Sequence, residues 1–136
     1  MMEEWIGRKH TEEWTVTHDR LACSLKSGTV EVFATPFMIA LMEYACLSLV
    51  QPGLPEGITT VGIRVDISHV APTPEGAAVT AEAELLETDG RRFLFKVTAR
   101  DEAGIIGEGT HERCTIKTES FQKKAAARLH PDKTGE

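Results

Sequence analysis

The segment TPFMIALMEYACLSLVQPG, residues 35–53, decides the fold of this chain. Its middle is almost entirely apolar, and Glu43 is the one carboxylate in it. A threonine followed by proline is typical of a helix start, where the Thr35 hydroxyl would cap free backbone N–H groups. The Pro52-Gly53 pair cannot continue a helix. We therefore predict one buried helix over Pro36–Gln51, with a carboxylate that needs a partner, because an unpaired buried charge costs on the order of several kcal/mol.

Downstream of this helix the apolar residues change from helical spacing to alternation. In TTVGIRVDISHVA, residues 59–71, every second side chain is apolar or histidine, which predicts a strand with one inward face. That face holds Val61, Ile63, Val65, Ile67, His69 and Ala71. Three more strands are predicted within residues 77–87, 91–101 and 105–118. Thr88-Asp89-Gly90 and Asp101–Gly104 mark the turns between them.

The order of the elements predicts an α+β fold. A first strand is expected in HTEEWTVTHD, residues 10–19, whereas residues 21–34 read as a loop with a short extended piece at Val30–Phe33. Five antiparallel strands would form a sheet with one apolar face, and the single helix is the element available to cover it. A sheet wrapped around one central apolar helix is the hot-dog arrangement. Because one helix covers such a sheet incompletely, we expect edge pairing into a homodimer or a larger homo-oligomer.

Length and composition fit one such domain and exclude several functions. The chain has 136 residues, a net charge of −6 and 41% hydrophobic residues, which is typical of a single globular domain and unlike a nucleic-acid-binding protein. Its longest apolar segment is too short to cross a bilayer, and the N-terminus lacks an apolar signal segment. Cys23, Cys46 and Cys114 are odd in number and far apart, so we expect a reduced, cytoplasmic protein. No histidine or cysteine pair has metal-ligand spacing.

The C-terminal tail is locally basic. We place the domain core at about residues 11–121 and the tail at 122–136, where Lys123, Lys124, Arg128 and Lys133 outnumber the two carboxylates. One interpretation is a short solvated helix or frayed end. The other is a basic patch that meets a phosphate-bearing ligand.

Three polar residues break the apolar pattern where chemistry could occur. Glu43 lies in the helix, and His69 lies on the apolar face of the strand that follows it. Each could be the other's partner, each could face one ligand across a dimer interface, or both could be structural. Thr35 stands at the helix start, where free N–H donors could hold a developing oxyanion. It precedes Glu43 by eight residues, or about 12 Å of helix, so the two cannot touch.

These residues also resemble a known family. EVFATPFMIALMEYAC, GIRVDISHVAPTPEG and GEGTHERCTI are similar to segments of the fluoroacetyl-CoA thioesterases, and the likeness runs from about Thr11 to Phe121. The resemblance implies a catalytic set of Thr35, Glu43 and His69. It places substrate-contacting residues at Gly62 and Arg113.

The function implied by this resemblance is hydrolysis of a small or medium acyl-CoA to a carboxylic acid and coenzyme A. Glu43 would act as nucleophile or as base for water, without a metal or dissociable cofactor, and the substrate would bind where two subunits meet. An enoyl-CoA hydratase and a non-catalytic acyl-CoA-binding module are the alternatives. The stretch CSLKSGTVE lacks the aromatic residues that close over the acyl group in the fluoroacetyl-selective member, so fluoroacetyl selectivity is not expected.

Overall fold

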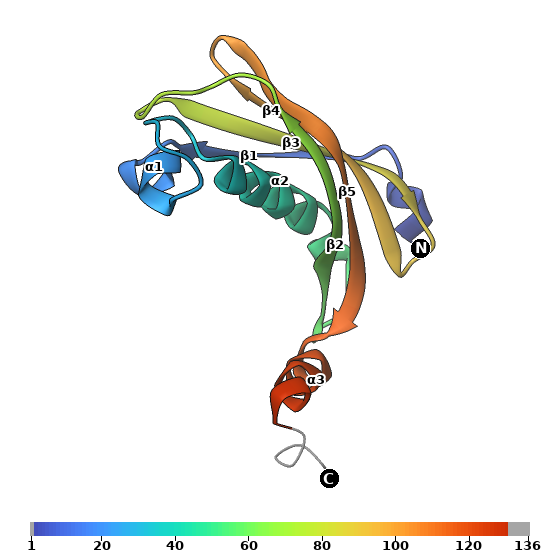
Figure 1. The fold of residues 1–136 in the computed structure, drawn as a ribbon. Coiled ribbons are helices and arrows are strands. Elements are labelled where there is room, and N and C mark those ends of the chain that lie inside the picture. The colour runs from blue at the N-terminus through green and yellow to red at the C-terminus, as the bar shows by residue number, and fades with distance from the viewer. Residues whose placement is uncertain (1, 131–136) are drawn as a thin grey trace.

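A five-stranded antiparallel sheet curves around one long helix (Figure 1). The structure, a computed structural model, describes residues 2–130. The strands are β1 (Lys9–Thr15), β2 (Ile58–His69), β3 (Ala78–Thr88), β4 (Arg92–Asp101) and β5 (Gly104–Lys117). They lie side by side in the order β1-β3-β4-β5-β2, so β1 and β2 are the two edges. The predicted α+β hot-dog arrangement is therefore confirmed.

The central helix, α2 (Thr35–Val50), is covered by the concave face of the sheet (Figure 1). Most of its side chains are apolar, and its buried ones are Met38, Leu41, Met42, Ala45, Cys46, Leu49 and Val50. The sheet meets them with the inward residues of β3 and β4. These are Val79, Ala81, Ala83, Leu85, Phe93, Phe95, Val97 and Ala99, all fully or almost fully buried. The alternation that predicted these strands is the one that buries them.

The strand β2 differs from the prediction in its register. Gly62 pairs with Arg113 and Arg64 pairs with Glu112, so the bulge between them leaves Ile63 without an opposite residue. A bulge reverses the alternation, because one extra residue shifts all later side chains to the other face. Val65, Ile67 and His69 thus share the helix-facing side with Gly62. The expectation that Val61 and Ile63 lie on the same face as His69 was wrong.

The N-terminal part of the chain also differs from the prediction. The strand β1 ends at Thr15, and His18 lies exposed in a short 3-10 helix, η2 (His18–Arg20), instead of in the strand. The loop expected at residues 21–34 contains the single-turn helix α1 (Ala22–Leu25). There are two other 3-10 turns. The turn η1 (Met2–Trp5) lies beside β3, and the turn η3 (Gln51–Gly53) directly follows α2.

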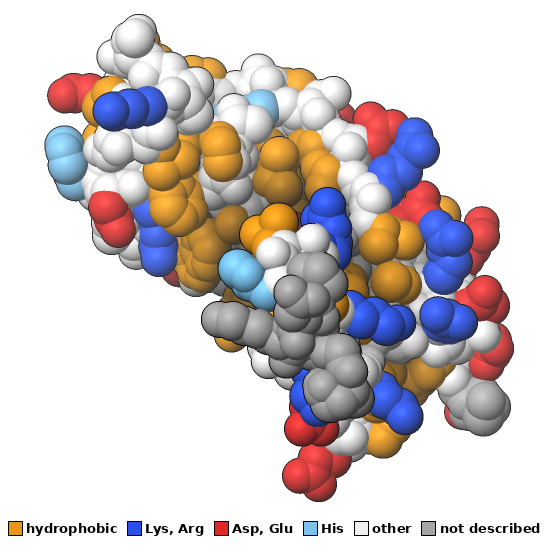
Figure 2. All heavy atoms as spheres, turned by 60° about the horizontal axis from the view of Figure 1, so that its bottom comes forward, with side chains coloured by type: hydrophobic (Ala, Val, Ile, Leu, Met, Phe, Trp, Pro, Cys, Tyr) orange, Lys and Arg blue, Asp and Glu red, His pale blue; other side chains and the backbone are white. Residues whose placement is uncertain are grey.

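The chain leaves the sheet through α3 (Thr118–Leu129), which projects from the end of β5 (Figure 1). Its side chains are nearly all exposed, so the tail forms a solvated helix as far as Leu129, and the basic patch for a phosphate-bearing ligand stays a prediction. In Figure 2 the α3 end of the molecule faces the reader, and Lys and Arg side chains gather around it with apolar side chains between them. Lys133 lies outside the described residues. Within residues 2–130 no helix is long and apolar enough to cross a membrane.

Candidate active site

The first candidate group joins the start of α2 to the end of β2. The Thr35 Oγ1 lies 2.7 Å from the His69 Nδ1, and the two atoms share a hydrogen bond. Thr35 is the first helical residue and Ala34 is the cap, with no side-chain cap hydrogen bond. The expected N-cap role of Thr35 was therefore wrong, because its hydroxyl is directed at the imidazole.

The other imidazole nitrogen, His69 Nε2, is buried and has no hydrogen-bond partner among the described residues. Burial lowers the pKa of His69, so the neutral imidazole prevails at pH 7. A hollow of about 340 Å³ adjoins the pair, and it is lined mainly by apolar side chains, including Val30, Val32 and Phe33. A polar nitrogen without a partner, beside an apolar hollow, is suited to a ligand that brings its own polar atom.

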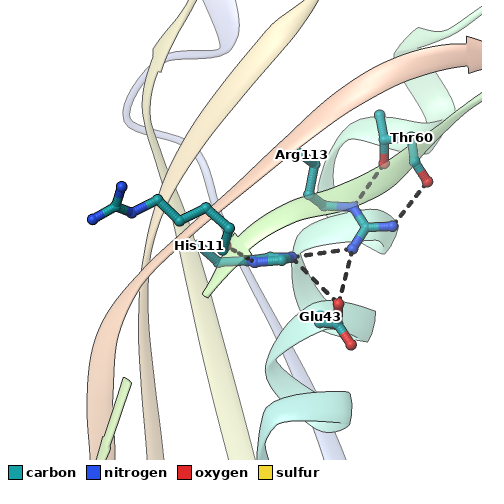
Figure 3. Close-up of polar contacts among 5 residues, drawn as sticks. Glu43, Thr60, His111 and Arg113 are labelled. Atoms are coloured by element: carbon teal, nitrogen blue, oxygen red, sulfur yellow. Dashed lines mark hydrogen bonds and ion pairs between the residues drawn. The ribbon is translucent and has the colours of Figure 1, made fainter. Parts of the chain in front are cut away.

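The second group surrounds Glu43 on the same helix (Figure 3). Its Oε2 lies 3.8 Å from Arg113 NH1 and 3.8 Å from His111 Nε2. The Arg113 guanidinium is fixed by Thr60, since Nε donates to its Oγ1 and NH2 donates to its carbonyl, both at 2.8 Å. The partner of Glu43 is therefore a buried arginine on β5, 6% exposed, whereas the Glu43 side chain is 40% exposed.

The hydrogen bonds of His111 define its protonation. Its Nδ1 lies 2.8 Å from the Arg64 carbonyl oxygen, which can only accept, so Nδ1 carries the proton. The Nε2 then accepts from Arg113 NH1 at 3.1 Å. Burial lowers the pKa of His111, in agreement with a neutral ring. The positive charge that faces Glu43 is consequently that of Arg113.

Gly62 makes room for this carboxylate. A Cβ on Gly62 would lie 2.8 Å from Glu43 Oε2 and 2.9 Å from His111 Cε1. The bulge in β2 therefore presents a residue without a side chain to the one charged position of the helix. Gly62 and Arg113, expected together from the resemblance, are paired directly across β2 and β5.

The two groups remain apart within one chain. Thr35 and His69 contact each other, and Glu43 contacts His111 and Arg113. Glu43 is eight positions after Thr35, which separates the two groups by about 12 Å along the helix. Glu43 and His69 are thus not each other's partner within one chain. His111 was missed by the sequence analysis; its spacing of two from Arg113 on β5 would have been the available signal.

The described residues support neither a metal site nor a cysteine nucleophile. No group of three or more His, Cys, Asp or Glu side chains in residues 2–130 could hold a metal ion. Cys46 is fully buried, and burial raises the pKa of its thiol, so it is not a thiolate nucleophile.

Comparison with known proteins first defines the class. A hypothetical protein from Thermus thermophilus, described as a thioesterase superfamily member, matches this chain with a TM-score of 0.83 and 28% identity. The match covers 96% of each chain. Together with the sheet that wraps α2, this likeness defines a hot-dog protein of the thioesterase superfamily.

The particular family follows from closer similarities. The family model for the fluoroacetyl-CoA-specific thioesterase, FlK, matches residues 16–119. The fluoroacetyl-CoA thioesterase of Streptantibioticus cattleyicolor is 46% identical over 94 residues, which are 69% of this chain and 68% of that protein. A solved structure of FlK has a TM-score of 0.85 and 37% identity, and the match covers 89% of this chain and 94% of that one. This chain belongs to the fluoroacetyl-CoA-specific thioesterase family.

Proposed function

We propose that this protein hydrolyses the thioester of an acyl-CoA, releasing a carboxylic acid and coenzyme A. The observation that carries the proposal is the Thr35–His69 hydrogen bond beside an apolar hollow, on a chain of a thioesterase family. A mutant of FlK, 38% identical to this chain, has been solved with fluoroacetate and CoA, the two halves of such a substrate. The proposed activity needs no redox group, because water supplies the incoming oxygen.

Each polar group has a role in this reaction. The Thr35–His69 pair would hold and polarise the thioester carbonyl near the start of α2, where free backbone N–H groups favour negative charge. Glu43 would either attack the carbonyl, so that the C–S bond breaks, the CoA thiolate leaves and takes up a proton, and water hydrolyses the resulting anhydride, or remove a proton from the water that attacks the thioester. Arg113 would keep the Glu43 carboxylate oriented, and Gly62 would leave space for the reacting group beside it.

The separation of the two groups is overcome if the site is shared by two subunits. β2 is an edge strand, and Ile63 and Val65 on it are 43% and 44% exposed, which is unusual for apolar side chains on a free edge. Pairing two copies of β2 antiparallel, with the two-fold axis near Val65, would bring the His69 end of one strand opposite the Gly62 end of the other. Glu43 of one subunit would then face Thr35 and His69 of the next. A homodimer is thus part of the proposal.

The acyl group would occupy the hollow beside His69. Its lining, given in full, is Ala22, Ser27, Gly28, Val30, Val32, Phe33, Thr35, His69, Val70, Ala71 and Pro72. The only aromatic side chain in it is Phe33, which is buried in the core. A volume of about 340 Å³ with an apolar lining suits a small or medium acyl chain better than a single fluoromethyl group. The cytoplasmic location stays a prediction.

A thiol-release assay tests the activity. Purified protein is incubated with acyl-CoAs that differ in length, branching and α-substitution, and free coenzyme A is measured. We expect release from at least one of them and loss of release in Glu43→Gln, which keeps the size of the side chain. Binding of acyl-CoA without any release, or hydration of an enoyl-CoA instead, would refute the hydrolase assignment.

A further inference from the structure

We propose that His111 is a positioning residue, which holds the Arg113 guanidinium close to Glu43 but out of hydrogen-bond distance. This inference rests on the proposed function, because Glu43 is the nucleophile or base of that reaction. None of the roles proposed above uses His111. Its ring is nevertheless only 2% exposed, and its Nε2 points toward both charged groups (Figure 3).

The Glu43 carboxylate lies near a positive charge without being hydrogen-bonded to it. Arg113 NH1 and His111 Nε2 each lie 3.8 Å from Glu43 Oε2. A hydrogen bond needs a distance of about 3.5 Å or less, so neither group donates to this oxygen. At this distance the charge of Arg113 attracts the carboxylate, while the oxygen lone pairs stay free. A hydrogen bond would occupy a lone pair and make Glu43 a weaker nucleophile or base.

The donors of Arg113 show why a second acceptor is needed. A guanidinium has five N–H donors in one plane. Arg113 uses Nε and NH2 on Thr60, each at 2.8 Å, and NH1 on His111 Nε2 at 3.1 Å. Without the imidazole, the acceptor left within reach of NH1 would be Glu43, and hydrogen bonds between two charged groups are the strong ones. His111 therefore competes with Glu43 for this donor and fixes the direction of both NH1 hydrogens.

The bulge in β2 prepares His111 for this task. The ring can accept from Arg113 only if its proton stays on Nδ1, and Nδ1 donates to the Arg64 carbonyl at 2.8 Å. Arg64 follows the bulge beside Gly62, where the hydrogen bonds of the strand ladder are locally disrupted. A Cβ on Gly62 would lie 2.9 Å from His111 Cε1, so the glycine also leaves room for the ring. One irregularity of the strand thus sets both the position and the tautomer of the imidazole.

Two substitutions separate the two contacts of the ring. The amide of His111→Gln reaches the place of Nε2 and can accept from Arg113, whereas the amide of His111→Asn reaches the place of Nδ1 and can only replace the contact to Arg64. We expect His111→Gln to keep at least roughly half of the wild-type kcat for thiol release. In His111→Asn kcat should fall roughly tenfold or more, with KM changed less than about twofold in both variants.

The matched control is His10→Asn, the same substitution at a half-buried histidine of β1 whose Nε2 contacts Glu12. It should leave kcat unchanged. Equal kcat values in the two His111 variants would overturn the positioning role, because the acceptor at Nε2 would then have no effect. A loss in His10→Asn as large as that in His111→Asn would overturn it as well.

A second measurement needs no catalysis. Crystal structures of the variants should show Arg113 NH1 within about 3.5 Å of the Glu43 carboxylate in His111→Asn, and at the wild-type distance in His111→Gln. NMR of the 15N-labelled wild type should show His111 protonated on Nδ1 alone. Protonation on Nε2, or an unchanged distance in His111→Asn, would overturn the proposal. If the distances change as expected but the wild type hydrolyses no thioester, the positioning role stands and the proposed function fails.

Discussion

The Thr35 hydroxyl and the His69 imidazole are 2.7 Å apart although the two residues are 34 positions apart in the chain. The contact joins the first turn of the buried helix to the last residue of the edge strand β2. It also leaves His69 Nε2 buried and without a partner among the described residues. One imidazole nitrogen is hydrogen-bonded, whereas the other is buried without a partner. This arrangement is more typical of a ligand-binding site than of a purely structural contact.

Replacing Thr35 should separate the chemical role of its hydroxyl from its packing. In Thr35→Val the side chain keeps its shape but loses the hydrogen bond to His69, and we expect kcat/KM to fall roughly tenfold or more. Thr35→Ser restores a hydroxyl and should recover most of the activity. Steady-state thiol release measures both variants, and equal activity of the valine and serine variants would show that the hydroxyl has no part in the reaction.

Acidification should destabilise the protein through two histidines, the part-buried His69 and the buried His111. Burial lowers the pKa of both His69 and His111 in the folded protein. Between about pH 6.5, the ordinary value, and the lower folded value, the unfolded chain binds more protons than the folded one. The free energy of unfolding should therefore fall as the pH drops through this range, and activity should persist below pH 6.5.

Two measurements check this pH dependence. NMR titration of the imidazole signals, assigned with single His variants, should give both residues apparent pKa values below 6.5. Urea unfolding at several pH values should show stability decreasing on acidification. A raised pKa for either residue would contradict the neutral state that we derive for it.

Adding one methyl group at Gly62 should displace the Glu43 carboxylate. The new Cβ of Gly62→Ala would stand 2.8 Å from Glu43 Oε2, which is closer than such atoms approach without a shift. Because the Glu43 side chain is 40% exposed, it can move aside, but the buried His111 ring, whose Cε1 would lie 2.9 Å from the new Cβ, must also shift. We therefore expect activity to fall at least tenfold, together with a loss of about 1–3 kcal/mol in the free energy of unfolding. Activity equal to that of wild type would show that the position of Glu43 near Gly62 is not required.

Arg113 should tolerate neither removal nor replacement by lysine. Its guanidinium donates through Nε and NH2 to Thr60 and through NH1 to His111. Arg113→Met leaves buried acceptors without donors, so we expect a loss of about 1–3 kcal/mol in the free energy of unfolding. Arg113→Lys keeps the charge but cannot make the forked contacts, and it should restore stability only in part. Denaturant unfolding measures the free energy of unfolding of both variants. Full rescue by lysine would mean that the charge at this position, and not the forked contacts, stabilises the fold.

Much of the fold could be predicted from the sequence, because in β3 and β4 the alternating apolar side chains are also the buried ones. The same rule misled in β2, where the run from Val61 to Ala71 alternates without interruption and Gly62 itself is the one sign of the bulge beside it. In the folded chain Gly62 lies against Glu43 beside this bulge, a tertiary contact that alternation along one strand does not encode. His111 escaped notice for a related reason, because Gly107 and Gly109 weaken the pattern on β5. Its role depends on Arg64 and Arg113, which only the folded chain brings to it.

The last prediction concerns the sharing of the site between two subunits. If Glu43 of one subunit serves Thr35 and His69 of the other, then His69→Ala and Glu43→Gln each inactivate both sites of their homodimers. We expect His69→Ala alone to lower the rate by at least roughly a hundredfold. In a mixed dimer of the two variants, one site carries both substitutions and the other carries neither.

Mixing the two inactive variants, with exchange of subunits, should therefore restore activity. Half of the dimers would be mixed, each with one intact site, so the recovered rate should approach about a quarter of that of wild type. Thiol release before and after exchange measures it, and size-exclusion chromatography with light scattering reports the dimer. The control is the double variant His69→Ala/Glu43→Gln mixed with itself, which has no intact site in any pairing. Formation of mixed dimers without recovery would place both groups of each site within one chain.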